Sequence, residues 1–356
     1  MTTLLAYRSN RIVELMAEPA EGRGADWLKD ALQQALMLEL ATLPPYLCGL
    51  WSIKDPSADG VAAEAIRRVV FDEMSHLGLA CNLLTTIGGV PRLADERTVP
   101  KYPGPLPGGV RPELSVFLSG LTKESLDLYA RIEEPDAPVA DAEGATHTSI
   151  GSFYTAVLAV FRQHEGLITG ARQLKRRMAH HGTGNSIEPL TSLAAVEKAI
   201  GIIKEQGEGT SGSPANPHPG EDGELAHYYV FRELFLGRKL IRTSETPETW
   251  AFAGEDIPMP AALPMATVPL GGWEAAGPLD ADTRRLLGDV NRAYSQMLRF
   301  LESAWQTDFP AEADDLLTEA VGQMFELEGP GRMLMERQLP DGSGRTYGPE
   351  FRYTDA

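Results

Sequence analysis

Apolar residues recur every three or four positions over most of the chain, which is the period of an amphipathic helix. The two strongest segments lie at 27–54 and 59–88. Further helices are predicted near 113–133, 149–180, 189–207, 224–241, 280–306 and 311–338. No alternating pattern is long enough to predict a sheet. The pattern therefore predicts an all-α helical bundle.

Segments rich in proline, glycine, alanine or acidic residues separate these helices, at 99–112, 133–148, 207–223 and 245–279. The last of them divides the chain. We predict a bundle over 1–244 and, over 245–356, an irregular linker followed by C-terminal helices packed on the bundle. Pro44 and Pro45 fall inside the first strong helix, where they remove two hydrogen-bond donors. A kink or a break is expected there.

Composition narrows the class of protein. The 356 residues carry a formal net charge of −18, which disfavours binding to nucleic acid or to an anionic membrane. No run of about 18 apolar residues predicts a membrane span, and the N-terminus does not resemble a signal peptide. Cys48 and Cys81 lie in apolar helical contexts, which is typical of buried thiols in a reducing compartment. We expect a cytoplasmic protein.

Acids and imidazoles interrupt the apolar stripes of two helices at the same spacing. Glu73 and His76 lie in "FDEMSHLGLACNLLTTIGG" (71–89), and Glu224 and His227 repeat the Glu-x-x-His spacing later in the chain. Residues three apart project from one face of a helix, so each pair presents a carboxylate and an imidazole to one point. One match means little in a chain with 50 acidic residues and 7 histidines. Two matches on apolar stripes are less easily explained by chance.

Two other helices each offer one glutamate. Glu39 lies in the middle of the first stripe, and Glu205 follows Ala199 and Ile202, with Glu208 as the second choice. Four buried carboxylates destabilise a fold unless cations neutralise them. Two divalent ions would do so, and carboxylate with imidazole favours iron, or alternatively manganese. The simpler interpretation is that the histidines are core residues and the glutamates surface charges.

Four segments and the C-terminal end resemble a known family: "LELATLPPYLCGLWSIK" (38–54), "DEMSHLGLACNLLTTIGGVPRL" (72–93), "IKEQGEGT" (203–210), "ELAHYYVFRELFLGR" (224–238) and "YGPEFRY" (347–353). They are similar to the ferritin-like domain of iminophenyl-pyruvate dimer synthases, the type found in the violacein-pathway enzyme that couples two oxidised amino-acid imines. The resemblance implies a ferritin-like bundle and a metal-dependent oxidative role in specialised metabolism. It points to Glu39, Glu73, His76, Glu224 and His227, with Glu205 or Glu208. Multidomain members carry a large region with no counterpart in these residues.

We therefore expect a non-heme di-iron oxidoreductase that binds two Fe ions and uses O2 as co-substrate. Its substrate would be a small molecule, for example one derived from an amino acid, and either a homo-oligomer or a biosynthetic partner enzyme is compatible with the sequence. Two other classes stay open. One is a ferroxidase or iron-binding ferritin-like protein without organic substrate. The other is a non-catalytic partner in a biosynthetic complex.

Overall fold

The computed structural model describes residues 7, 9–57, 60–135, 149–177, 186–207, 213–218 and 223–355. Helices make up most of these residues, so the prediction of a helical protein is confirmed. The longest are α2 (Ala25–Ser52), α3 (Gly60–Thr86), α9 (Ala281–Gln306) and α10 (Pro310–Met335). Shorter ones are α1 (Arg11–Ala17), α4 (Lys123–Ile132), α5 (Ile150–Gln163), α6 (Leu193–Gly207), α7 (His227–Leu236) and α8 (Trp273–Ala276).

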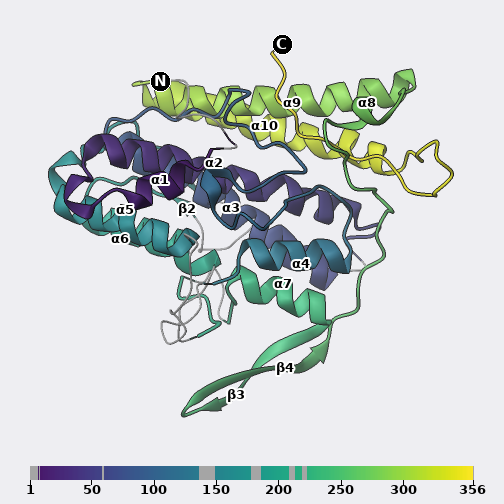
Figure 1. Cartoon of the computed structure of the whole chain (residues 1–356), viewed down its shortest axis with the longest axis horizontal. Helices are drawn as coiled ribbons and strands as arrows, with labels where there is room; N and C mark the ends of the chain where they lie inside the picture. Colours follow the sequence, from purple (N-terminus) through teal and green to yellow (C-terminus); the bar gives the residue numbers. More distant parts are fainter. Residues whose placement is uncertain are drawn as a thin grey trace.

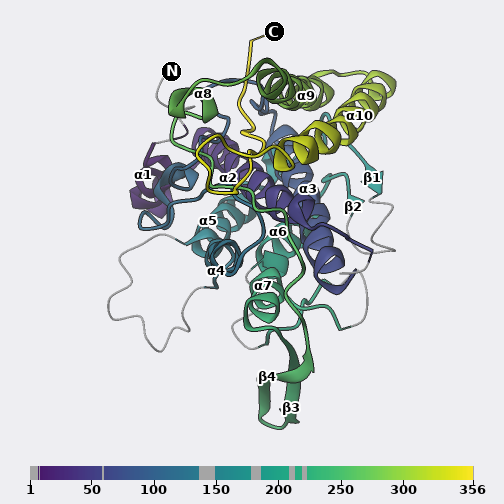
Figure 2. The ribbon, with the colours of Figure 1, turned by 90° about the vertical axis from the view of Figure 1, so that its right-hand side faces the viewer.

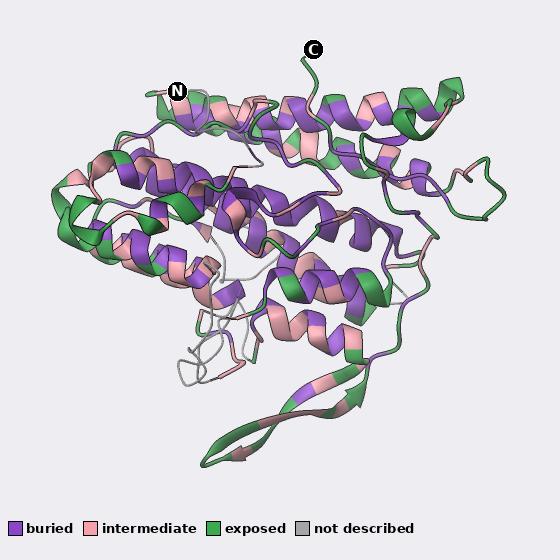
Figure 3. Ribbon diagram, viewed as in Figure 1, coloured by how far each residue is buried: buried purple, intermediate pink, exposed green. Residues whose placement is uncertain are grey.

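The long helices form layers (Figure 1). The α2–α3 pair lies in the middle, α9 and α10 cover it on one side, and α4, α5, α6 and α7 lie on the other. Buried residues are concentrated where the layers meet (Figure 3), and α2 is buried along most of its length. The site described below lies between the middle layer and the layer of four shorter helices.

The proline pair does not break the first helix. α2 runs unbroken through Pro44 and Pro45 to Ser52, so the expected break is wrong. Pro45 has no N–H to donate to the carbonyl of Ala41 four residues earlier. The Tyr102 hydroxyl donates to that carbonyl instead, at 2.8 Å. A side chain from a distant loop thus replaces the missing helical hydrogen bond.

Polar contacts attach the C-terminal helices to the bundle. Trp305 of α9 donates from Nε1 to Oδ1 of Asn82 on α3, at 2.9 Å. Arg332 of α10 donates to the carbonyls of Trp51 and Ile53, which α2 leaves without helical partners at its C-terminal end. These contacts fix one side of α2 and α3, while the opposite side faces α4 to α7.

The sequence pattern did not predict one element, an antiparallel hairpin of β3 (Arg238–Glu245) and β4 (Glu248–Asp256). It follows α7 directly and projects away from the layers, as Figures 1 and 2 show. A smaller pair, β1 (Arg176–Arg177) and β2 (Ser186–Ile187), lies beside α3. Short 3-10 turns occur at Ala20–Gly22, Pro107–Gly109 and Glu165–Leu167. None of the helices in the described part of the chain is both long and apolar enough to cross a bilayer.

Candidate metal centre

Four helices bring five side chains that could bind a metal together in the buried interior. Glu39 comes from the middle of α2, Glu73 and His76 from the middle of α3, Glu133 from the C-cap of α4, and His227 from the first residue of α7. All five are buried. They form two groups of three, Glu39–Glu73–His76 and Glu73–Glu133–His227, in each of which one atom per residue lies within 4.8 Å of the others. Glu73 belongs to both groups.

The distances between the facing atoms are similar to those between ligand atoms bound to one metal ion. Nδ1 of His76 lies 3.7 Å from Oε2 of Glu39 and 3.4 Å from Oε1 of Glu73. Nδ1 of His227 lies 3.0 Å from the same Oε1 of Glu73 and 3.9 Å from Oε2 of Glu133. Two ligands bonded to one ion at about 2.1 Å are roughly 3–4 Å apart. The five atoms thus suit two ion positions that share the Glu73 carboxylate.

Hydroxyl groups hold the second oxygen of each glutamate. Tyr154 donates to Oε1 of Glu39 at 2.5 Å, and Tyr46 donates to Oε1 of Glu133 at 2.6 Å. Thr42 donates to Oε2 of Glu73 at 2.7 Å. Each carboxylate therefore has one oxygen fixed by the protein and the other turned toward the centre. Such outer hydrogen bonds orient metal ligands.

The outer ring nitrogens of both histidines are also engaged. Nε2 of His76 lies 2.8 Å from Oε1 of Gln206, and Nε2 of His227 lies 3.2 Å from Oδ2 of Asp72. Because an amide or carboxylate oxygen only accepts, each Nε2 carries a proton, so in the neutral ring each Nδ1 presents a lone pair to the centre.

One atom tests directly whether a cation fits. Nδ1 of His227 is buried and has no hydrogen-bond partner among the described residues. It lies only 3.0 Å from Oε1 of Glu73, but not in a direction that allows a hydrogen bond. A buried nitrogen without a partner is costly, and when the ring is neutral its lone pair repels the carboxylate oxygen at this distance. A metal ion that accepts both lone pairs removes both costs, so the donor set fits a metal.

The pKa values reflect the concentration of negative charge. Burial, followed by repulsion from the Glu73 carboxylate, raises the pKa of Glu39 to about 8 and that of Glu133 to about 7. Burial also opposes charge on His76, but its contacts with Glu73 and Glu39 outweigh this and raise the pKa to about 9. The pKa of His227 is likewise raised, because Asp72 and Glu73 outweigh its burial. Without a metal, protons would supply the compensating charge.

A small cavity of about 30 Å³ adjoins Glu39, Glu73, His76 and Glu133. Its other walls are mainly aliphatic: Leu38, Leu106, Ile132, Ile150 and Ile203. Gly207, at the end of α6, also lines it, and a Cβ there would lie 2.9 Å from Oε2 of Glu133. Glycine at 207 therefore keeps the metal-facing oxygen of Glu133 accessible.

Glu205 does not join the centre. Its Oε2 lies 3.0 Å from Nε2 of His218, and its side chain is about one-third exposed. The buried face of α6 runs through Ala199, Ile203 and Gln206, whereas the prediction followed Ala199, Ile202 and Glu205. An error of one residue turns a helical side chain by about 100°. Gln206 reaches His76 instead, and Glu208, the alternative, lies outside the described residues.

Glu224 also lies outside both groups of described residues. The prediction assumed that Glu224 and His227 share a helix, but α7 begins at His227. The backbone before it is extended, so the three-residue spacing no longer places both side chains on one face. Oε1 of Glu224 is 3.5 Å from Nη1 of Arg68 instead.

Glu133 is the site residue that the sequence prediction missed. It lies at the boundary between the helix predicted near 113–133 and the acidic linker predicted at 133–148, and it was not considered as a ligand. A signal was present, since Glu133 continues the apolar face of α4 that contains Leu126 and Tyr129. A glutamate that ends an apolar stripe deserves the same consideration as one in its middle.

Comparison with known proteins agrees with this architecture. Residues 32–236 match a family model described as ferritin-like. A ferritin-like protein from Caulobacter vibrioides, with a crystal structure at 1.95 Å resolution, has a TM-score of 0.57 and 21% sequence identity. The likeness covers 85% of this chain and 95% of that one, and at this identity it concerns the fold alone. No curated protein matches the chain.

Proposed function

Because the chain belongs to the ferritin-like family, we propose that it is an O2-activating dinuclear non-heme iron oxidase or oxygenase. Glu39, Glu73 and His76 would bind one ion, and Glu73, Glu133 and His227 the other. The observation that carries this proposal is Nδ1 of His227, buried without a hydrogen-bond partner in the described chain and facing a carboxylate oxygen at 3.0 Å. Carboxylate and imidazole are ligands that suit iron, with manganese as the alternative.

When bound, two iron ions would supply the electrons for reduction of O2. The chain supplies the surroundings. Three carboxylates offset three of the four positive charges, and the hydroxyls of Thr42, Tyr46 and Tyr154 keep one oxygen of each carboxylate directed at the centre. Asp72 and Gln206 fix the protonation of the outer histidine nitrogens. The aliphatic walls of the cavity exclude bulk water, which strengthens these interactions.

We also propose a chemical class for the substrate. The resemblance to iminophenyl-pyruvate dimer synthases supports a small oxidised amino-acid derivative and a role in specialised metabolism. The residues that carry this resemblance include Glu39, Glu73, His76 and His227, all of which lie at the centre. We do not extend the proposal to imine coupling.

A second candidate is a ferroxidase that turns over iron without an organic substrate. The size of the cavity supports it, because about 30 Å³ admits water or O2 but not an amino acid. The two candidates differ in what starts O2 consumption. A ferroxidase consumes O2 with Fe(II) alone, whereas a substrate oxidase needs the organic molecule for continued turnover.

Metal analysis tests the proposal. After anaerobic loading with Fe(II) and desalting, we expect about two iron ions per chain by mass spectrometry, followed by O2 uptake when air is admitted. Glu113→Ala, at an exposed position, should load like the natural chain. Fewer than about one ion per chain would contradict the di-iron assignment, and would favour a non-catalytic helical partner protein.

A further inference from the structure

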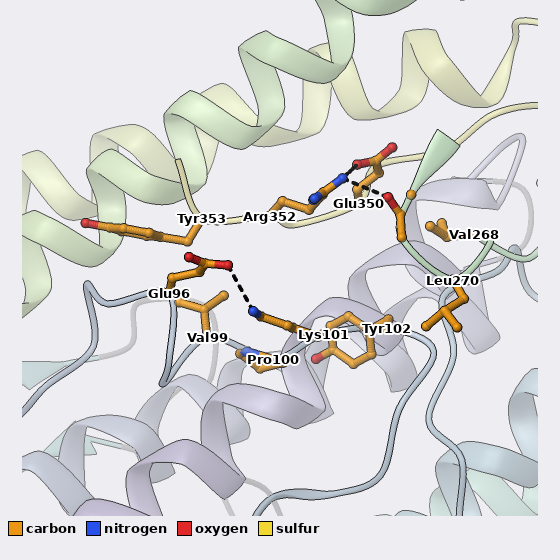
Figure 4. Close-up of a pocket in the computed structure, with 12 residues that line it drawn as sticks. Glu96, Val99, Pro100, Lys101, Tyr102, Val268, Leu270, Glu350, Arg352 and Tyr353 are labelled. Atoms are coloured by element: carbon orange, nitrogen blue, oxygen red, sulfur yellow. Dashed lines mark hydrogen bonds and ion pairs between the residues drawn. The ribbon is translucent and has the colours of Figure 1, made fainter. Parts of the chain in front are cut away.

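A second and larger cleft, of about 390 Å³, lies on another side of α2. It is formed where the loop at 96–102 meets two segments of the C-terminal extension, 268–272 and 350–353 (Figure 4). No metal-centre residue lines it. Tyr102 in its wall bonds the carbonyl of Ala41, which lies two residues, or about 200° of helix rotation, from Glu39. The cleft and the metal centre are therefore separate sites.

Two cations reach into the cleft from facing walls, as Figure 4 shows. Nη1 of Arg352 donates to the carbonyl of Gly271 at 2.9 Å and lies 3.7 Å from Oε2 of Glu350. Within the described part of the chain, Nε and Nη2 of Arg352 have no side-chain or backbone acceptor. Lys101 lies opposite, and among the described residues its ammonium is paired with the exposed Glu96 alone, at 3.0 Å. N–H groups of Arg352 and Lys101 therefore remain available to donate hydrogen bonds to a bound ligand.

The rest of the lining is mostly apolar: Val99, Pro100, Tyr102, Val268 and Leu270. Leu270, one of the residues that line the cleft, is 68% exposed. Its position beside the two cations provides an apolar surface for the body of a bound molecule. Clefts of a few hundred Å³ with apolar walls and a few convergent polar groups are typical small-molecule sites.

The loop that carries Leu270 is shaped to hold Arg352. Gly272 has φ of +85°, and a Cβ there would lie 2.7 Å from Oε2 of Glu350 and 2.9 Å from Nη1 of Arg352. Only glycine lets the backbone approach this ion pair so closely. Glu350 is itself buried and accepts the backbone N–H of Trp273 at 2.7 Å. One end of the guanidinium is therefore anchored, while the other faces the cleft.

We propose that this cleft binds a small organic carboxylate with an apolar body. The free edge of Arg352 matches the two oxygens of a carboxylate, and Lys101 adds a second donor. Glu96 and Glu350 balance the two cations, so a monoanion is favoured over a dianion such as phosphate. The apolar body lies against Leu270, Val268 and the ring of Tyr102.

Calorimetric titration of the metal-loaded full chain with 3-phenylpropanoate tests this, with 3-phenylpropanamide as the neutral match. We expect one-to-one binding of the acid with Kd of about 0.1–1 mM, and binding of the amide at least about tenfold weaker. Arg352→Gln should lower the affinity for the acid by about tenfold or more. Lys101 is exposed, so Lys101→Gln should leave folding intact and lower the affinity for the acid by about threefold.

Arg345→Gln is the matched control, since Arg345 is an exposed arginine that lies outside the lining of the cleft. It should bind the acid like the natural chain. Absence of saturable binding up to about 10 mM acid would overturn the proposal. Equal affinity for acid and amide, or an unchanged affinity in both cleft variants, would do the same. Iron content should be unaffected in every variant, so failure here is distinct from failure of the di-iron proposal.

Discussion

The two halves of the metal centre are built differently. Glu39, Glu73 and His76 lie in the middle of α2 and α3, which have 28 and 27 residues and pack against each other along their length. Glu133 and His227 lie at the ends of α4 and α7, which have only 10 residues each. One half therefore depends on helix interiors, and the other on where two short helices stop and start.

This difference affects how each half is held. Side chains within a long helix have their direction fixed by hydrogen bonds on both sides of them. A residue at a helix end needs other contacts, and here they come from outside its own helix: Tyr46 of α2 holds Glu133, and Asp72 of α3 holds His227. The central pair of helices thus supplies the ligands of the first half and orients those of the second.

Removing the shared carboxylate should have the largest effect. Glu73→Ala takes one ligand from both ion positions, so we expect almost no iron after Fe(II) loading, measured by mass spectrometry. Glu113→Ala is the control on an exposed carboxylate, and circular dichroism verifies that both variants fold. Equal iron content in the two variants would remove Glu73 from the centre.

Removing a ligand that belongs to one half should remove one ion. We expect about one iron per chain in Glu39→Ala and about one in Glu133→Ala, because each leaves the other group of three intact. Complete loss of iron in both variants would show that the ions bind only as a pair, and would break the division into halves.

Metal affinity should rise with pH. Near pH 6 the metal-free fold holds protons on Glu39, Glu133 and His76, whose pKa values are raised to about 8, 7 and 9, and on His227, whose pKa is also raised. Stability of the metal-free protein therefore falls as pH rises through about 7 to 9. Since metal displaces these protons, affinity should gain up to about 100-fold per pH unit near pH 6, for two protons per ion.

The measurement is isothermal titration with Mn(II), a redox-stable substitute for iron, at pH 6, 7 and 8 in buffers of different ionisation enthalpy. Proton release is then obtained directly. The thermal shift on metal binding should also grow with pH. An affinity independent of pH would mean that the four buried groups have already lost their protons, and would contradict the protonated state of the metal-free centre.

The outer contacts allow each half to be weakened separately. Asp72→Asn should act on His227 and Gln206→Leu on His76, each lowering Mn(II) affinity at its own position by about tenfold. Calorimetry should resolve a change in one of two binding steps, whereas a merely structural role would shift both or only the unfolding temperature. Asp127→Asn, on α4 and away from the centre, is the control.

The smallest effect is expected for the two predicted ligands that the structure places outside both groups of three. Glu205→Ala and Glu224→Ala should both retain about two iron ions, because neither carboxylate belongs to a group of three in the described chain. Loss of an ion in Glu224→Ala would mean that α7 extends back to Glu224 when metal binds.

The sequence by itself determined the helical class and the middle of the site. Glu39, Glu73 and His76 could be found because hydrophobic periodicity reveals which face of a long helix is buried, and a charged group on that face requires compensation. His227 was predicted as a ligand together with Glu224, but in the described chain it is grouped with Glu73 and Glu133. Its stripe in α7 was correct, but the pattern extended the helix back to Glu224.

Only the tertiary structure decided the rest. Whether Glu133 belongs to a linker or to the core depends on where α4 ends, and whether Glu205 or Gln206 faces the centre depends on a rotation of about 100°. The cleft beside Arg352 brings together segments about 250 residues apart, which no local pattern can reveal. Periodicity is a local property of the chain, whereas helix ends, helix rotation and distant contacts are set by packing.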